Sequence, residues 1–178
     1  MQSSSFSIVV IPLIAISLSI LFYVILLRKT TQKKIFKRYV LTIILAAFLL
    51  NAVWEILQIP LYLEGVYIWS HILFCLLASV ADAIMVLLIY FGFGMIYKNA
   101  LWIQNLNPSR IAFLVLAGGI GAVLAETRHL SIGTWSYAES MPIISVVNVG
   151  LSPVLQFMIL PLLIYIVAVK IATPHPYT

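Results

Sequence analysis

The chain has 178 residues, of which 63% are hydrophobic and 8% are charged, and its mean hydropathy is +1.15. A soluble domain carries about 25% charged residues, so most of this chain must be solvated by lipid. The net charge of +5 is typical of basic loops at a membrane surface and does not indicate nucleic-acid binding. The composition excludes a soluble enzyme and predicts a multi-pass integral membrane protein.

Five apolar segments are long enough to cross a bilayer, since a transmembrane helix needs about 20 residues. No segment shows the alternating ten-residue pattern of a transmembrane barrel strand. The sequence therefore predicts an all-α fold, with one transmembrane domain over residues 1–178. We expect its five spans at about 6–27, 39–63, 71–97, 110–126 and 145–170.

The basic residues predict the orientation of these spans. Six of them lie in one stretch between the first two spans, RKTTQKKIFKR, at 28–38. If this stretch is cytoplasmic, Lys98, Arg110 and Lys170 lie on the same side, and only Arg128 lies outside. The positive-inside rule then places the N-terminus outside and the C-terminus inside. The short chain and compact loops favour a prokaryotic inner (plasma) membrane.

A polar stripe runs along the second span, in the sequence NAVWEILQIPLY. Asn51, Glu55, Gln58 and Tyr62 are offset by 0, 4, 7 and 11 residues, which places them on one helix face. An intramembrane carboxyl group costs about 2.5–3.5 kcal/mol by insertion scales. Because hydrogen bonding between helices does not need an ionisable group, Glu55 is a candidate functional residue.

Three other spans carry similar stripes, and the first span, with few polar residues, is expected at the periphery. Asp82 lies within the third span, and we expect it deeper than Glu55. Asn148, Ser152 and Gln156 follow a 0, 4, 8 spacing in the fifth span. We expect one polar pocket in the outer half of the membrane. The alternative is that these amides only bond helices together, at about 0.6 kcal/mol each.

The fourth span combines small residues with an acid at its outer end, and a long loop follows. Gly118 and Ala122 permit close helix packing, and Glu126 is expected to pair with Arg128 and His129. The loop at 127–144 should fold over the outer mouth, since non-helical backbone at membrane depth must be covered. The expected outer gate is Glu126, Arg128, Trp135 and Tyr137.

Acid–base chemistry is the function that intramembrane carboxyl groups favour most directly. A protonated carboxyl can donate a proton to an alkene or epoxide, and aromatic rings can stabilise the resulting cation. Trp54 adjoins Glu55, although it points about 100° away around the helix. The histidines lack the spacing of a zinc motif, so neither a metal nor another cofactor is predicted.

The run Asn51-Ala52-Val53-Trp54-Glu55 resembles an N-x-x-W-E motif in the integral-membrane terpene cyclases of fungal meroterpenoid pathways. The resemblance implies that Glu55 is the proton donor and that a second acid comes from another helix, for which Asp82 is the mid-span candidate. It covers five of the 178 residues. Those cyclases have seven spans, so the present chain departs from their architecture.

These observations predict a small membrane enzyme that acts on a lipid or isoprenoid substrate, with Glu55 and Asp82 as catalytic residues. The alternatives are a proton-coupled carrier or transport subunit, and a non-catalytic lipid-binding or assembly protein. The expected partners are membrane lipids and an apolar small molecule, and nucleic acid is not expected. The sequence does not decide whether the protein forms a homo-oligomer. The expected substrate-binding residues are Asn51, Trp54, Gln58, Tyr62, Glu126, Arg128, Trp135, Tyr137, Asn148 and Gln156.

Overall fold

The computed structural model describes the backbone of residues 2–173 and the side chains of residues 10–173. Within this part of the chain, five helices are long and apolar enough to span a membrane, which confirms the predicted all-α architecture. Short 3-10 turns and one two-stranded hairpin lie between them. The helices are α1 (Gln2–Lys29), α2 (Lys33–Gln58), α3 (Trp69–Ile96), α4 (Pro108–Ser131) and α5 (Leu151–Ala172).

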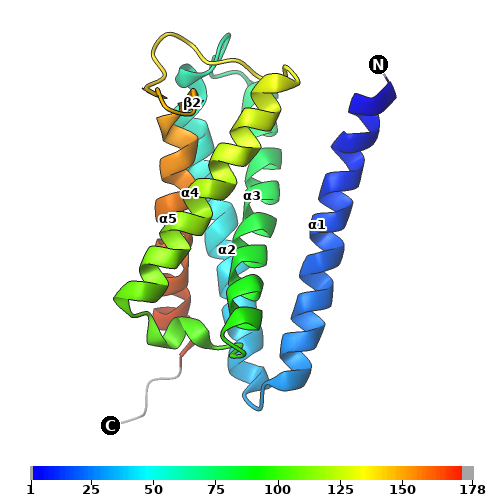
Figure 1. The fold of residues 1–178 in the computed structure, drawn as a ribbon, viewed down its shortest axis with the longest axis vertical. Helices are drawn as coiled ribbons and strands as arrows, with labels where there is room; N and C mark the ends of the chain where they lie inside the picture. The colour runs from blue at the N-terminus through cyan, green and yellow to red at the C-terminus, as the bar shows by residue number, and fades with distance from the viewer. Residues whose placement is uncertain (1, 174–178) are drawn as a thin grey trace.

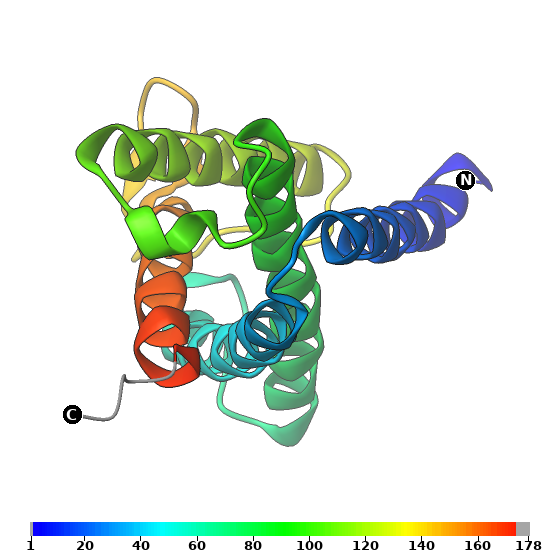
Figure 2. The ribbon, with the colours of Figure 1, turned by 90° about the horizontal axis from the view of Figure 1, so that it is seen from below.

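Helix α2 lies at the centre of the bundle, where it packs against both α3 and α5. Helix α4 packs on α5 and scarcely contacts α3. Helix α1 packs on α3 and stands at the edge of the molecule, as Figures 1 and 2 show. The peripheral position of α1 agrees with the small number of polar residues in the first span.

Charge separates along the bundle axis. The end at which α1 ends and α2 begins is the lower end in Figure 1, and we call it the basic end. The four glutamates lie at or near the opposite end, which we call the acidic end, and Asp82 lies midway along α3. The residues at or near the basic end are Arg28, Lys29, Lys33, Lys34, Lys37, Arg38, Lys98, Arg110 and Lys170.

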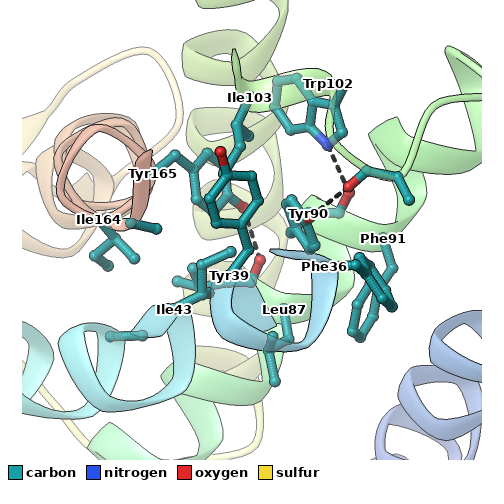
Figure 3. Packing of buried hydrophobic residues seen from close by; sticks show 14 of the residues in the cluster. Phe36, Tyr39, Ile43, Leu87, Tyr90, Phe91, Trp102, Ile103, Ile164 and Tyr165 are labelled. Carbon is teal, nitrogen blue, oxygen red and sulfur yellow. Dashed lines mark hydrogen bonds between the residues drawn. The ribbon is translucent and has the colours of Figure 1, made fainter. Parts of the chain in front are cut away.

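A cluster of aromatic side chains fills the half of the bundle toward the basic end (Figure 3). Tyr39, Tyr90, Trp102 and Tyr165 have no exposed surface. Their polar atoms bond mainly to backbone: Trp102 Nε1 donates to the Tyr90 carbonyl at 2.9 Å, and the Tyr165 hydroxyl donates to the Val86 carbonyl at 2.7 Å. Because buried polar groups need such partners, this half is a satisfied and closed core.

Gly118 lets α4 approach α5 closely, as its place in the small-residue stripe predicted. A Cβ atom at this position would lie 1.9 Å from the backbone oxygen of Phe157. We expect Gly118→Ala to lower the free energy of unfolding by about 1–3 kcal/mol, the usual cost of overpacking. Unfolding in detergent would measure this change. Gly121→Ala is the matched control, since a Cβ atom there meets nothing within 4 Å, and equal stability of both variants would contradict the close contact.

The acidic end differs from the predicted arrangement at the start of the fifth helix. Strands β1 (Ile143–Ile144) and β2 (Val149–Gly150) form an antiparallel hairpin, and α5 begins only at Leu151. Asn148 therefore lies in the hairpin turn, exposed and with a φ of 53°. The 0, 4, 8 spacing placed it on the helix, but its left-handed backbone is typical of a turn residue, which asparagine tolerates.

Candidate functional site

A hydrogen-bonded polar cluster joins α2, α3 and α5 toward the acidic end. Gln156 of α5 is its hub. Gln156 Nε2 lies 2.9 Å from Asn51 Oδ1, 3.1 Å from Glu55 Oε1 and 3.2 Å from Asp82 Oδ2. An amide nitrogen carries only two hydrogens, so these three acceptors compete for two bonds.

Gln58 and Ser152 extend the cluster along α2 and α5. Gln58 Nε2 donates to Glu55 Oε1 at 2.8 Å, and the Ser152 hydroxyl donates to Gln58 Oε1 at 2.9 Å. Trp54 Nε1 donates in turn to Ser152 Oγ at 3.2 Å. The indole of Trp54 therefore joins the cluster through Ser152 of α5, although Trp54 lies on a different face of α2 from Glu55.

Glu55 and Asp82 lie at one level of the bundle, because the same amide nitrogen contacts both and their carboxyl groups interact with each other. This differs from the expectation that Asp82 lies deeper. Among the described residues, the side chains that donate hydrogen bonds to the pair are the amides of Gln58 and Gln156. Since two negative charges side by side repel strongly in an apolar site, the pair is best balanced when it holds one proton.

In the described part of the chain, the amide donors reach one oxygen of each carboxyl group of the pair. Only Oε1 of Glu55 and Oδ2 of Asp82 accept hydrogen bonds from side chains. Every fully enclosed side-chain nitrogen or oxygen among the described residues has a partner. The remaining oxygen of each group has no amide donor, and the two carboxyl groups interact with each other.

A second polar cluster covers the acidic end, around Glu126 at the end of α4. Glu126 is buried, and its Oε2 accepts bonds from the Tyr137 hydroxyl and from Trp135 Nε1. The His129 ring stacks on Trp135 with centroids 4.2 Å apart, and its Nδ1 bonds Thr134 Oγ1 at 3.2 Å. The observed partners of Glu126 are therefore aromatic donors from the loop, instead of the predicted Arg128 and His129.

Tyr62 lies between the two clusters. Its ring contacts Trp135 and Tyr137 with centroids 6.2 and 5.6 Å away, and its backbone bridges to that of Tyr137. Burial and the nearby carboxyl groups of Glu126 and Glu55 raise the pKa of the Tyr62 phenol. Burial and the bond to Glu126 also raise the pKa of Tyr137. Both phenols therefore stay protonated and can donate hydrogen bonds.

The loop after α4 is bonded to the segment that follows α2, and we call the loop at 132–142 the strap. Leu63 N donates to the Ser136 carbonyl at 2.8 Å, Ala138 N to the Leu61 carbonyl at 3.0 Å. The Ser140 hydroxyl adds a bond to the Pro60 carbonyl at 3.1 Å. The sequence predicted that the loop folds over this end, and these bonds place it there (Figure 1).

The predicted site residues thus separate into three groups. The first polar cluster, which we call the Glu55 cluster, holds Asn51, Trp54, Gln58 and Asp82 together with Gln156. The second, which we call the covering cluster, holds Glu126, Trp135 and Tyr137, and Tyr62 packs against it. Asn148 and Arg128 make no side-chain hydrogen bond to either cluster in the described chain. Ser152 was not predicted as a site residue, although its position four residues before Gln156 marked it as part of the same helix stripe.

An apolar groove of about 340 Å³ lies between α2 and α3. Ile44 and Phe48 line it from α2, and Ala83 and Leu87 line it from α3. Ile44, Phe48 and Glu55 are spaced by 4 and 7 residues, so they fall on one face of α2. The groove therefore shares a helix face with the acid.

Comparison with protein-family models, with curated proteins and with solved structures finds no match to this chain. Within the described residues, no group of three or more His, Cys, Asp or Glu side chains has the arrangement of a metal site. The functional argument therefore rests on the geometry of the two clusters.

Proposed function

We propose that this protein is a small enzyme of a prokaryotic plasma membrane that acts on a lipid or isoprenoid by carboxyl acid–base chemistry. Its acidic end faces the outer side. Glu55 is the proton donor, Asp82 is its partner, and Asn51, Gln58 and Gln156 orient them. The observation that carries the proposal is the Glu55–Asp82 pair, whose hydrogen-bond donors in the described part of the chain are amides.

A carboxyl pair that shares one proton suits a cofactor-free isomerisation or cyclisation. The proton leaves Glu55 and adds to an alkene or epoxide of the substrate, which leaves a cation in the site. The cation is stabilised by carboxylate charge and by the aromatic faces of Trp54 and Tyr62. The pair then takes a proton from the product cation, so the site returns to its starting state.

The closed half of the bundle favours an enzyme over a carrier. A proton-coupled carrier needs polar groups along the whole path, whereas the aromatic cluster of Figure 3 occupies the half toward the basic end. The polar atoms of its described residues bond to backbone or to neighbouring side chains. The described residues of this half therefore offer no polar path from the Glu55 cluster to the basic end, which favours a site for chemistry over a transport path.

Lipid extraction and native mass spectrometry of the purified protein would test the proposal. The comparison uses the wild type, Glu55→Gln, and Glu139→Gln as a control that removes an exposed acid. We expect wild type and control to convert a lipid or isoprenoid from the host membrane, and Glu55→Gln to retain it unconverted. Equal conversion by folded Glu55→Gln would contradict the proposal, and the same lipids in all three samples would favour a carrier or assembly protein.

A further inference from the structure

The basic end carries charge that the protein does not neutralise by itself. Nine of the ten basic residues lie there, while all five acids lie elsewhere, in the middle of α3 or toward the acidic end. Counter-ions for this end must therefore come from outside the chain. At the end of a membrane-spanning bundle, the anions at hand are the phosphate groups of lipids.

A cavity of about 220 Å³ opens at this end, between the α1–α2 turn and the segment that follows α3. Lys29 and Lys98 line it from opposite segments, with Thr31 and Asn99 beside them. Leu26 and Leu101 form an apolar wall, and both are nearly fully buried. The lining of the cavity thus combines two lysines with apolar side chains.

The backbone of the segment after α3 presents Lys98 to the cavity in an unusual conformation. Lys98 has a φ of 50°, in the left-handed region that side chains other than glycine and asparagine rarely adopt. Lys98 N donates to the Met95 carbonyl at 3.2 Å, and Asn99 N to the Gly94 carbonyl at 3.0 Å, which hold this turn. A glycine would fit the turn without strain, so the turn itself does not require a lysine.

We propose that this cavity binds the phosphate group of an anionic membrane lipid, with Lys29 and Lys98 as its two cations. The half-buried Met95 in the lining offers apolar surface to the hydrocarbon next to the headgroup, and this contact would distinguish a lipid from soluble phosphate. Basic pockets between transmembrane helices bind anionic headgroups in the same way. The proposal is independent of the chemistry at Glu55.

Native mass spectrometry of the detergent-purified full chain, titrated with phosphatidylglycerol or phosphatidylcholine, would test this site. The test variant is Lys29→Gln with Lys98→Gln. The matched control is Lys37→Gln with Lys170→Gln, which removes the same charge from the same end but outside the cavity lining. An interfacial lysine contributes about 1 kcal/mol toward anionic lipid, or about fivefold in affinity. We expect the test pair to weaken phosphatidylglycerol binding about 25-fold, with little change in the control.

Three outcomes would overturn the proposal. Equal losses in both double variants would show a diffuse surface attraction. Equal binding of phosphatidylcholine and phosphatidylglycerol by the wild type would show that the cavity does not distinguish an anionic headgroup from a zwitterionic one. Displacement of phosphatidylglycerol by inorganic phosphate at a similar concentration would assign the cavity to a soluble anion. Lys98→Gly separates binding from folding, since we expect it to keep the thermal stability of the wild type and still lose about fivefold in affinity.

Discussion

Replacement of Gln156 by Leu should destabilise the bundle by about 2–4 kcal/mol, because several buried polar groups lose their shared donor. Gln156 Nε2 lies within 3.2 Å of acceptors on Asn51, Glu55 and Asp82, which come from two other helices. Leucine has nearly the same volume but no donor. The two carboxyl groups would then face each other across an apolar side chain, and α5 would lose its polar contact with α2 and α3.

Unfolding of the purified variant in detergent, followed by circular dichroism, would measure the loss. Asn148→Gly is a control that removes another amide from the same predicted stripe. Since Asn148 lies in the hairpin turn with a φ of 53°, glycine is compatible there and the stability should stay near that of the wild type. A Gln156→Leu variant as stable as Asn148→Gly would show that the hydrogen bonds of the hub contribute nothing to stability.

The second large effect concerns turnover in variants of the carboxyl pair. We expect Glu55→Gln and Asp82→Asn each to lower turnover by about 10²–10⁴-fold, the usual contribution of general acid–base catalysis. The double variant should be little slower than the slower single variant, because residues that act as one unit do not contribute additively. The assay follows the substrate that lipid extraction identifies.

Both single substitutions keep an acceptor oxygen for Gln156, so the variants should fold. Native mass spectrometry of bound substrate would confirm that the site is still formed. Losses that multiply in the double variant would mean that the two acids act independently, and the shared-proton mechanism would then be wrong. Full activity of Asp82→Asn alone would assign all proton transfer to Glu55.

The five helices were predictable because long apolar runs have few other solutions in a membrane protein. The start of α5 was not predictable from hydropathy. Residues 142–148 are apolar enough to extend the span. The sequence does not show that Ile143 and Ile144 pair with Gly150 and Val149 in a hairpin. Local backbone geometry at Asn148, not hydrophobicity, decides where this helix begins.

The polar cluster was predictable in part. Helical spacing placed Asn51, Glu55 and Gln58 on one face of α2, and the same rule selected Gln156 on α5. It did not predict that Trp54 reaches Ser152, since the reach of a long indole depends on how closely α2 and α5 approach. The partners of Glu126 were not predictable for a related reason. Trp135 and Tyr137 lie nine and eleven positions along a loop, and helical spacing does not show how a loop folds back.

The strap has a consequence for which product the proposed reaction releases. It bonds to the segment after α2 through backbone groups of Leu61 and Leu63, and the rings of its Trp135 and Tyr137 contact Tyr62 at the acidic end. A carbocation formed beneath such a cover meets protein and hydrocarbon before it meets water. Proton loss should therefore outcompete hydration, so the reaction would release an alkene rather than an alcohol. Loosening the strap would raise the alcohol fraction without changing the acid that starts the reaction.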